Sequence, residues 1–184
     1  SLSKSWGSVG ENITMTGSGF AANERDIKIL FAEQEVATEV RVDADALGRW
    51  QKSFQVPQKP KGTYNVTAEG ELTKKKEVSA LSFQIKPGLV LSPGEGHVGM
   101  ELRVTGGGFA VRIGVVVMYE DKLMATVETD SKGSFEVTLA VPESQHGQRQ
   151  VTANDAAGNN ATAIFIMESE PPGTPELVSP ADGS

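Results

Sequence analysis

The chain has 184 residues, of which 38% are hydrophobic and 20 are glycine, and it carries a formal net charge of −7 and no cysteine. This composition is typical of a globular protein with one or two domains, and the lack of cysteine excludes disulfides, thiolate metal sites and a thiol nucleophile. An acidic surface repels phosphate backbones, so nucleic acid is not an expected partner.

The first expected elements are an edge segment with a turn at residues 2–10 and a strand at residues 12–16, where Ile13 and Met15 alternate with polar residues. This strand runs into the motif Thr16-Gly17-Ser18-Gly19-Phe20-Ala21. We interpret the motif as a loop that caps a sandwich, with its phenylalanine in the core, because glycines after a strand allow a positive φ or a close approach. The alternative, a phosphate-cradling loop, requires a strand–loop–helix unit and a further glycine or Gly-Lys-Ser/Thr, and the chain has neither.

Further strands are predicted where apolar residues alternate or cluster, at residues 27–31, 36–42 (as one strand or two short ones), 50–56, 61–68 and 81–85. The segment Asp45-Ala46-Leu47-Gly48 predicts a type I turn whose carboxylate accepts local backbone N–H groups. Pro57 ends the strand that follows, because proline has no N–H for the ladder. Tyr64 occupies the place of a corner tyrosine in a β-sandwich.

The same features return in the second half, so the chain is a tandem repeat. The glycine motif recurs 89 positions later as Thr105-Gly106-Gly107-Gly108-Phe109-Ala110, and Val9-Gly10 recurs as Val98-Gly99. The turn and the later strands recur at residues 130–133, 135–141, 146–153 and 163–167. Their offset falls from 89 to 85 to 82, which predicts insertions in the first copy before Gly48 and in the loop of residues 74–76. Arg149 stands where the first copy has Tyr64, so the tyrosine corner is not expected to be shared.

Six or seven short strands per copy, without a helical period, predict an all-β chain of two antiparallel β-sandwiches. We expect a first sandwich at residues 1–86, a second at residues 87–168, and at residues 169–184 a proline-rich linker with the truncated start of a further β module. The junction Lys86-Pro87-Gly88 is short and contains proline, so we expect limited freedom between the sandwiches.

The combination of Leu-Ser-x(6)-Gly, Thr-Gly-x-Gly-Phe, Asp-x-x-Gly and a strand ending in Val-Pro resembles the immunoglobulin-like repeats of prokaryotic surface proteins, close to the IPT/TIG type, over residues 2–167. Residues 175–184 resemble the start of a fibronectin type III or related domain. The resemblance implies an immunoglobulin-like fold, an extracellular or cell-surface location, and no catalytic residues. It implies as partners neighbouring domains of the same chain and a cell-surface or cell-wall protein or glycan.

The expected function is therefore that of a non-catalytic structural or adhesive module, which spaces or displays other domains and binds a protein or glycan through its loops. The alternative is an accessory carbohydrate-binding or spacer module of a secreted polysaccharide-acting enzyme, although two Trp and two Tyr are few for an aromatic sugar platform. A transcription-factor-type TIG domain is a second rival, against which the acidic charge argues. We expect a monomeric fragment that starts at a boundary within a longer protein and does not insert into a membrane, since no apolar run reaches the length of a membrane helix.

No catalytic, cofactor or metal residue is predicted. His97 and His146 lie in glycine-flanked turns without a zinc-site spacing, so solvated loop histidines are expected. A calcium site remains an alternative to the turn role of Asp45, with oxygen ligands from Asp43, Asp45, Asp121, Asp130 and Asp155, but a full EF-hand loop is missing.

Two further stretches are open to more than one interpretation. Residues 74–76 are three lysines, interpreted as a solvated hairpin tip, with a ligand contact as the alternative. Residues 115–119 are so apolar that a strand covered on both faces is expected, with an exposed docking patch as the alternative.

Overall fold

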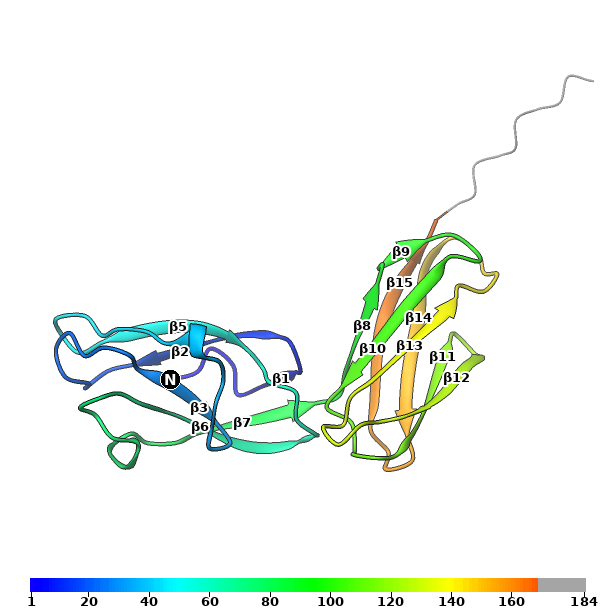
Figure 1. The fold of residues 1–184 in the computed structure, drawn as a ribbon. Coiled ribbons are helices and arrows are strands. Elements are labelled where there is room, and N and C mark those ends of the chain that lie inside the picture. The colour runs from blue at the N-terminus through cyan, green and yellow to red at the C-terminus, as the bar shows by residue number, and fades with distance from the viewer. Residues whose placement is uncertain (169–184) are drawn as a thin grey trace, which may run out of the picture.

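A computed structural model describes residues 1–168, which form two β-sandwiches one after the other along the chain (Figure 1). The prediction of an all-β chain with two antiparallel sandwiches is confirmed. The only helical segments within residues 1–168 are two short 3-10 turns, η1 (Thr38–Val40) and η2 (Lys75–Glu77). Neither is long or apolar enough to span a membrane. The predicted proline-rich linker and truncated module at residues 169–184 lie outside the described residues.

The first sandwich packs a five-stranded sheet against a smaller one. The larger sheet has the order β1 (Trp6–Ser8), β7 (Leu81–Lys86), β6 (Gly62–Glu69), β3 (Lys28–Phe31) and β4 (Gln34–Glu35). The smaller sheet pairs β2 (Asn12–Gly17) with β5 (Trp50–Gln55), and residues 1–3 add to its edge, where Ser3 N donates to Thr14 O. The apolar side of each alternating strand faces the other sheet, so Ile13, Met15, Phe54 and Phe83 meet in one core.

The second sandwich repeats this arrangement with longer strands. One sheet has the order β13 (Phe135–Ala140), β10 (Glu101–Gly107) and β8 (Gly88–Ser92). The other has the order β12 (Lys122–Glu128), β11 (Gly114–Tyr119), β14 (Gly147–Asp155), β15 (Asn160–Met167) and β9 (Glu95–Gly96). In both sandwiches a short early strand pairs in parallel with the last strand, β1 with β7 and β9 with β15.

The two copies differ where the repeat offset changes. In the second copy, β11 and β12 form a regular hairpin. In the first copy, β4 has only two residues and the chain continues through η1, returning to the sheet in a single bridge between Ile27 and Val42. The predicted strand or strand pair at residues 36–42 is therefore wrong: the extra residues form a 3-10 turn.

Two other predictions need correction. In β11, Val115 and Val117 are buried but Val116 is 36% exposed, so the strand at residues 115–119 is covered on one face and not on both. The tyrosine corner has a counterpart in the second copy after all. Tyr64 Oη donates to Pro60 O at 2.8 Å, and Arg149 Nε donates to Gln145 O, also four residues upstream, at 2.7 Å.

Candidate functional site

The repeated glycine motif forms the same structure twice, at the end of β2 and at the end of β10. Gly17 lies opposite Trp50 in the ladder, and Gly106 lies opposite Phe135. In each copy the aromatic ring occupies the space that a Cβ on the glycine would need, so the strand can continue there only with glycine.

The phenylalanine of each motif packs edge-on against that same ring. The ring centroids are 5.6 Å apart for Phe20 and Trp50, and 5.5 Å apart for Phe109 and Phe135. Both phenylalanines are buried. The interpretation of the motif as a sandwich cap is therefore confirmed, and the alternative of a phosphate-cradling loop is wrong, because no helix follows either motif in the described residues.

Aspartates start three tight turns of one design, two of which were predicted from the sequence. Asp45 Oδ1 accepts the N–H groups of Leu47 and Arg49 at 2.8 and 2.9 Å. Asp130 and Asp155 accept the same two N–H groups of their own turns at 2.8 to 2.9 Å. The N–H of Arg49, followed by that of Leu47, lowers the pKa of Asp45. These carboxylates are thus occupied by backbone donors.

Glu24 is a buried carboxylate that the sequence analysis did not single out. It connects the loop after β2 to the loop between β6 and β7. It is 3% exposed. Its two oxygens accept hydrogen bonds from Ala21 N, Leu72 N, Thr73 N and Thr73 Oγ1 at 2.6 to 3.0 Å. Burial by itself raises the pKa of Glu24, but these donors, led by Thr73, outweigh burial and lower the pKa to about 2.

We expect Glu24 to make the first sandwich sensitive to acid. Because the folded pKa is about 2 and the ordinary value is 4.5, the stabilisation is complete above about pH 4.5 and is lost as the pH falls towards 2. Linkage puts its size at about 3 kcal/mol. The variant Glu24→Gln should lose about 2–3 kcal/mol at pH 7 and show a flatter stability profile between pH 5 and 2.

Urea unfolding followed by tryptophan emission measures this effect, because both tryptophans, Trp6 and Trp50, lie in the first sandwich. The control is Glu39→Gln, which changes an exposed glutamate of η1. If Glu24→Gln and Glu39→Gln have the same stability at pH 7, the role given to Glu24 is wrong.

In the second sandwich Asp155, at the end of β14, plays the part that Glu24 plays from the loop between β2 and β3 in the first. Asp155 Oδ2 accepts Ala110 N at 3.1 Å, and Ala110 is the repeat equivalent of Ala21. The same oxygen accepts Asn159 Nδ2 at 2.6 Å. Asn159 Oδ1 in turn accepts Lys61 Nζ, from the first sandwich, at 2.9 Å. This connects the interior of the second sandwich to the surface of the first.

The other residues considered as metal or ligand contacts stay apart. Within residues 1–168 no three His, Asp or Glu side chains form a group that could hold a metal ion. His97 and His146 are both exposed, and each lies in a different loop of the second sandwich. Lysines 74–76 belong to the connection between β6 and β7, which contains the 3-10 turn η2. An ion pair between Lys75 and Glu33 holds this connection against the β3–β4 turn.

The junction brings the end of the first sandwich against the repeated glycine motif of the second. Only Pro87 separates β7 from β8. Val9 packs over Gly107, where an added Cβ would lie 2.9 Å from the Val9 Cβ, and Pro60 lies against Gly133. Together with the bond between Lys61 and Asn159, these contacts come from two different loops of the first sandwich.

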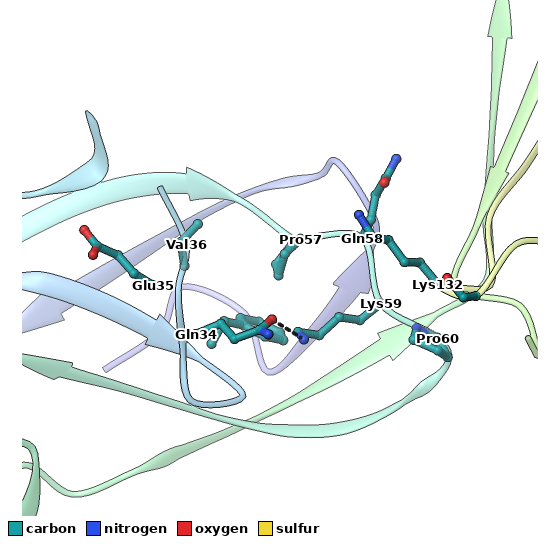
Figure 2. Close-up of a pocket in the computed structure, with 10 residues that line it drawn as sticks. Gln34, Glu35, Val36, Pro57, Gln58, Lys59, Pro60 and Lys132 are labelled. Atoms are coloured by element: carbon teal, nitrogen blue, oxygen red, sulfur yellow. Dashed lines mark hydrogen bonds between the residues drawn. The ribbon is translucent and has the colours of Figure 1, made fainter. Parts of the chain in front are cut away.

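A hollow of about 540 Å³ lies beside this junction (Figure 2). The first sandwich supplies the β3–β4 turn and residues 57–60, and the second supplies Ser131 and Lys132. Lys59 extends along the hollow and donates from Nζ to Gln34 Oε1 at 3.0 Å. The carboxylate of Glu35 is paired with Arg41 at 2.9 Å, and this hydrogen bond lowers the pKa of Glu35.

The groups that line this hollow suit recognition of a bound molecule. Its lining contains no histidine, no cysteine, and no second carboxylate beside Glu35 that would make a general acid–base pair. Amide, ammonium and proline groups from two sandwiches offer hydrogen bonds and flat apolar contacts, so a molecule that binds there touches both.

Comparison with protein families assigns each sandwich separately. Residues 1–85 match the family model described as the IPT/TIG domain. Residues 93–169 match the family model described as a bacterial Ig domain. No curated protein matches the chain closely enough to count as a relative.

Several solved structures align with most of this chain at low identity and with TM-scores below 0.5. They include the adhesin InvE of Yersinia pseudotuberculosis (9% identity, TM-score 0.42, covering 91% of this chain and 58% of that one). SGBP-B of a Bacteroides ovatus mixed-linkage glucan utilization locus, in complex with a heptasaccharide, gives 13% identity and a TM-score of 0.39, covering 88% of this chain and 44% of that one. A C-terminal fragment of intimin, in complex with the intimin-binding domain of Tir, gives 11% identity and a TM-score of 0.35, covering 91% of this chain and 62% of that one. The chain thus spans less than two thirds of each of these structures.

Proposed function

From the premise that this chain consists of two tandem immunoglobulin-like domains, one of IPT/TIG type and one of bacterial Ig type, we propose that it is a non-catalytic module of a larger surface protein. In this role it holds other domains away from the cell at a defined distance and presents its own loops to a protein or glycan. The proposed location is extracellular or at the cell surface.

The observation that carries this proposal is the junction. A flexible linker would let two domains reorient freely, whereas here β7 and β8 are separated by one proline. Contacts from two loops, through Val9, Pro60 and Lys61, close the remaining space against the second sandwich. A chain built in this way keeps its length and direction, which is what a spacer requires.

The occupied carboxylates of the two domains and the net charge support a non-catalytic role. The buried carboxylates Glu24 and Asp155 are occupied by backbone and side-chain donors. Neither has a histidine among those partners. The net charge of −7 discourages contact with nucleic acid.

Protease treatment of intact cells that express the protein tests the proposed location. We expect peptides from both domains to be released into the medium, identified by mass spectrometry, while a cytosolic marker protein stays intact. Lysed cells of the same culture provide the reference for full digestion. Peptides that appear only after lysis would contradict surface display.

A further inference from the structure

The hollow at the junction of the two domains sets two ammonium groups against a single carboxylate (Figure 2). Lys59 comes from the first domain and Lys132 from the second. Within residues 1–168 neither lysine belongs to an ion pair. The carboxylate, that of Glu35, is already paired with Arg41 at 2.9 Å. The hollow is therefore positively charged, although the chain as a whole carries −7.

Lys59 holds its ammonium group where a counter-ion is missing. The side chain is partly buried and extends along the hollow. Its Nζ donates to a neutral acceptor, Gln34 Oε1, at 3.0 Å, and lies 5.9 Å from the centroid of the Tyr64 ring. Surface lysines usually keep the charged group in water, and a cation that is withdrawn from water is stabilised by an anion. Because none of the described residues supplies that anion, the position favours one from outside the chain.

Lys132 is available to the same ligand. It is exposed on the turn that Asp130 starts, and Asp130 is the acidic residue nearest to it in sequence. Asp130 Oδ1 accepts the backbone N–H groups of Lys132 and Ser134 at 2.8 and 2.9 Å, so this carboxylate is engaged within its own turn. Gly133 of the same turn packs against Pro60 of the first domain. The turn thus holds the second ammonium group beside the first domain.

The edge of the larger sheet of the first domain runs along the same hollow. β4 is the short last strand of that sheet, and both of its residues, Gln34 and Glu35, line the hollow. In the part of the chain that the structure describes, β4 pairs with β3 alone, so its outer side can bond to a further extended segment. A peptide that adds to such an edge reaches neighbouring groups with its alternate side chains.

We propose that this hollow binds an extended acidic peptide segment of a partner protein, with its carboxylates on Lys59 and Lys132. The two ammonium groups select an anion, whereas the amides of Gln34 and Gln58 and the edge of β4 suit peptide groups. The one aromatic residue of the lining, Phe31, is 1% exposed, so no ring surface is offered for stacking a sugar, which favours a peptide over an acidic glycan. The inference rests on the display role proposed above and gives that role a partner of stated chemistry.

Nuclear magnetic resonance of the purified, ¹⁵N-labelled chain with synthetic peptides tests the proposal. The probe is a capped hexapeptide that repeats Glu-Val three times, and its matched control has glutamine in place of glutamate. Tri-galacturonate tests for an acidic glycan. We expect the acidic peptide to shift the backbone amide signals of Gln34, Glu35, Ser131 and Lys132 along one saturable curve, so that both domains respond together. The glutamine peptide should bind about tenfold more weakly, and salt should weaken only the acidic peptide.

Lys59→Met and Lys132→Met each remove one charge and keep an unbranched side chain. Each should weaken binding of the acidic peptide about three- to fivefold, and the double variant about tenfold. The control is Lys122→Met, an exposed lysine of β12 outside the hollow, which should leave binding unchanged. If Lys59→Met does not fold, the exposed position of Lys132 lets Lys132→Met carry the test.

Four results would overturn the proposal. They are no saturable shift with the acidic peptide, equal binding of the glutamine peptide, unchanged binding by the folded lysine variants, and tighter binding of tri-galacturonate than of the peptide. All of these are measured on the purified chain and do not depend on where the protein is located. A failure here is therefore distinguishable from a failure of surface display in the protease experiment.

Discussion

Replacing Phe109 by alanine is expected to lower the free energy of unfolding of the second domain by about 3–5 kcal/mol. The ring is fully buried, and its centroid lies 5.5 Å from that of Phe135. Its removal leaves a cavity between two sheets that glycines already hold in a fixed arrangement, so the surrounding chain can close only part of the space. A loss of this size is comparable with the whole stability of a domain of this length, about 4–12 kcal/mol.

Urea unfolding followed by far-ultraviolet circular dichroism measures the effect on Phe109→Ala, while tryptophan emission from the same samples monitors the first domain separately. The control is Val111→Ala, two residues away, where the side chain is 45% exposed and the loss should stay within about 0.5 kcal/mol. A loss below about 1 kcal/mol for Phe109→Ala would show that this ring does not stabilise the core as the packing indicates.

The second large effect is expected for Gly133→Ala, at about 2–4 kcal/mol. Gly133 has φ +70°, and a Cβ there would overlap the carbonyl oxygen of Phe109 and lie 3.3 Å from Pro60 Cα. Gly133 O also accepts Phe109 N at 3.0 Å. The added methyl group therefore has three effects. It strains the backbone of the turn, it displaces Phe109 and its core ring, and it pushes against Pro60 of the first domain.

Gly158→Ala separates the backbone cost from the overlap. Gly158 closes an equivalent aspartate turn in the same domain with φ +80°, but nothing lies within 4 Å of its added Cβ. It should therefore lose only the cost of a left-handed alanine, about 1–2 kcal/mol. Urea unfolding measures both losses of unfolding free energy. If Gly133→Ala and Gly158→Ala lose the same amount, the overlap with Phe109 does not destabilise the domain and the prediction is wrong.

Local patterns made the repeated cap predictable from the sequence. Alternating apolar residues, glycines after a strand, and aspartate followed by glycine three positions later each restrict φ and ψ within a few residues. The repeat doubled every one of these signals. Most strand positions, the buried phenylalanines and the turns at Asp45 and Asp130 were therefore accessible without a structure.

Features that depend on distant contacts were not accessible in this way. Glu24 receives hydrogen bonds from Leu72 and Thr73, nearly fifty positions away, and nothing in its own neighbourhood marks it as buried. Strand β12 was missed because a bulge between Val117 and Met118 shifts its pairing, so apolar residues no longer alternate along it. Arg149 makes the same bond to a backbone carbonyl four residues upstream that Tyr64 makes, although the two side chains differ in chemistry and the sequence does not indicate a shared role.

The indole N–H of Trp50, which has no hydrogen-bond acceptor within residues 1–168, is another feature that depends on distant contacts. Two tryptophans and two tyrosines argued against an aromatic platform for sugars, and a buried ring is indeed no platform. What the sequence does contain is the contrast between Trp50 and Phe135 at matching positions of the repeat. Comparing the two copies residue by residue would have shown that one ring carries a donor and the other does not.

The parallel pairing of β1 with β7 and of β9 with β15 determines how each domain bears tension. The chain enters a domain near the first strand of the pair and leaves it at the end of the second, and both strands run in the same direction. A pull on the two ends slides one strand along the other, so bonds such as those from Gln84 N to Ser5 O and from Ile166 N to Gly94 O carry the load in shear, together and not one after another.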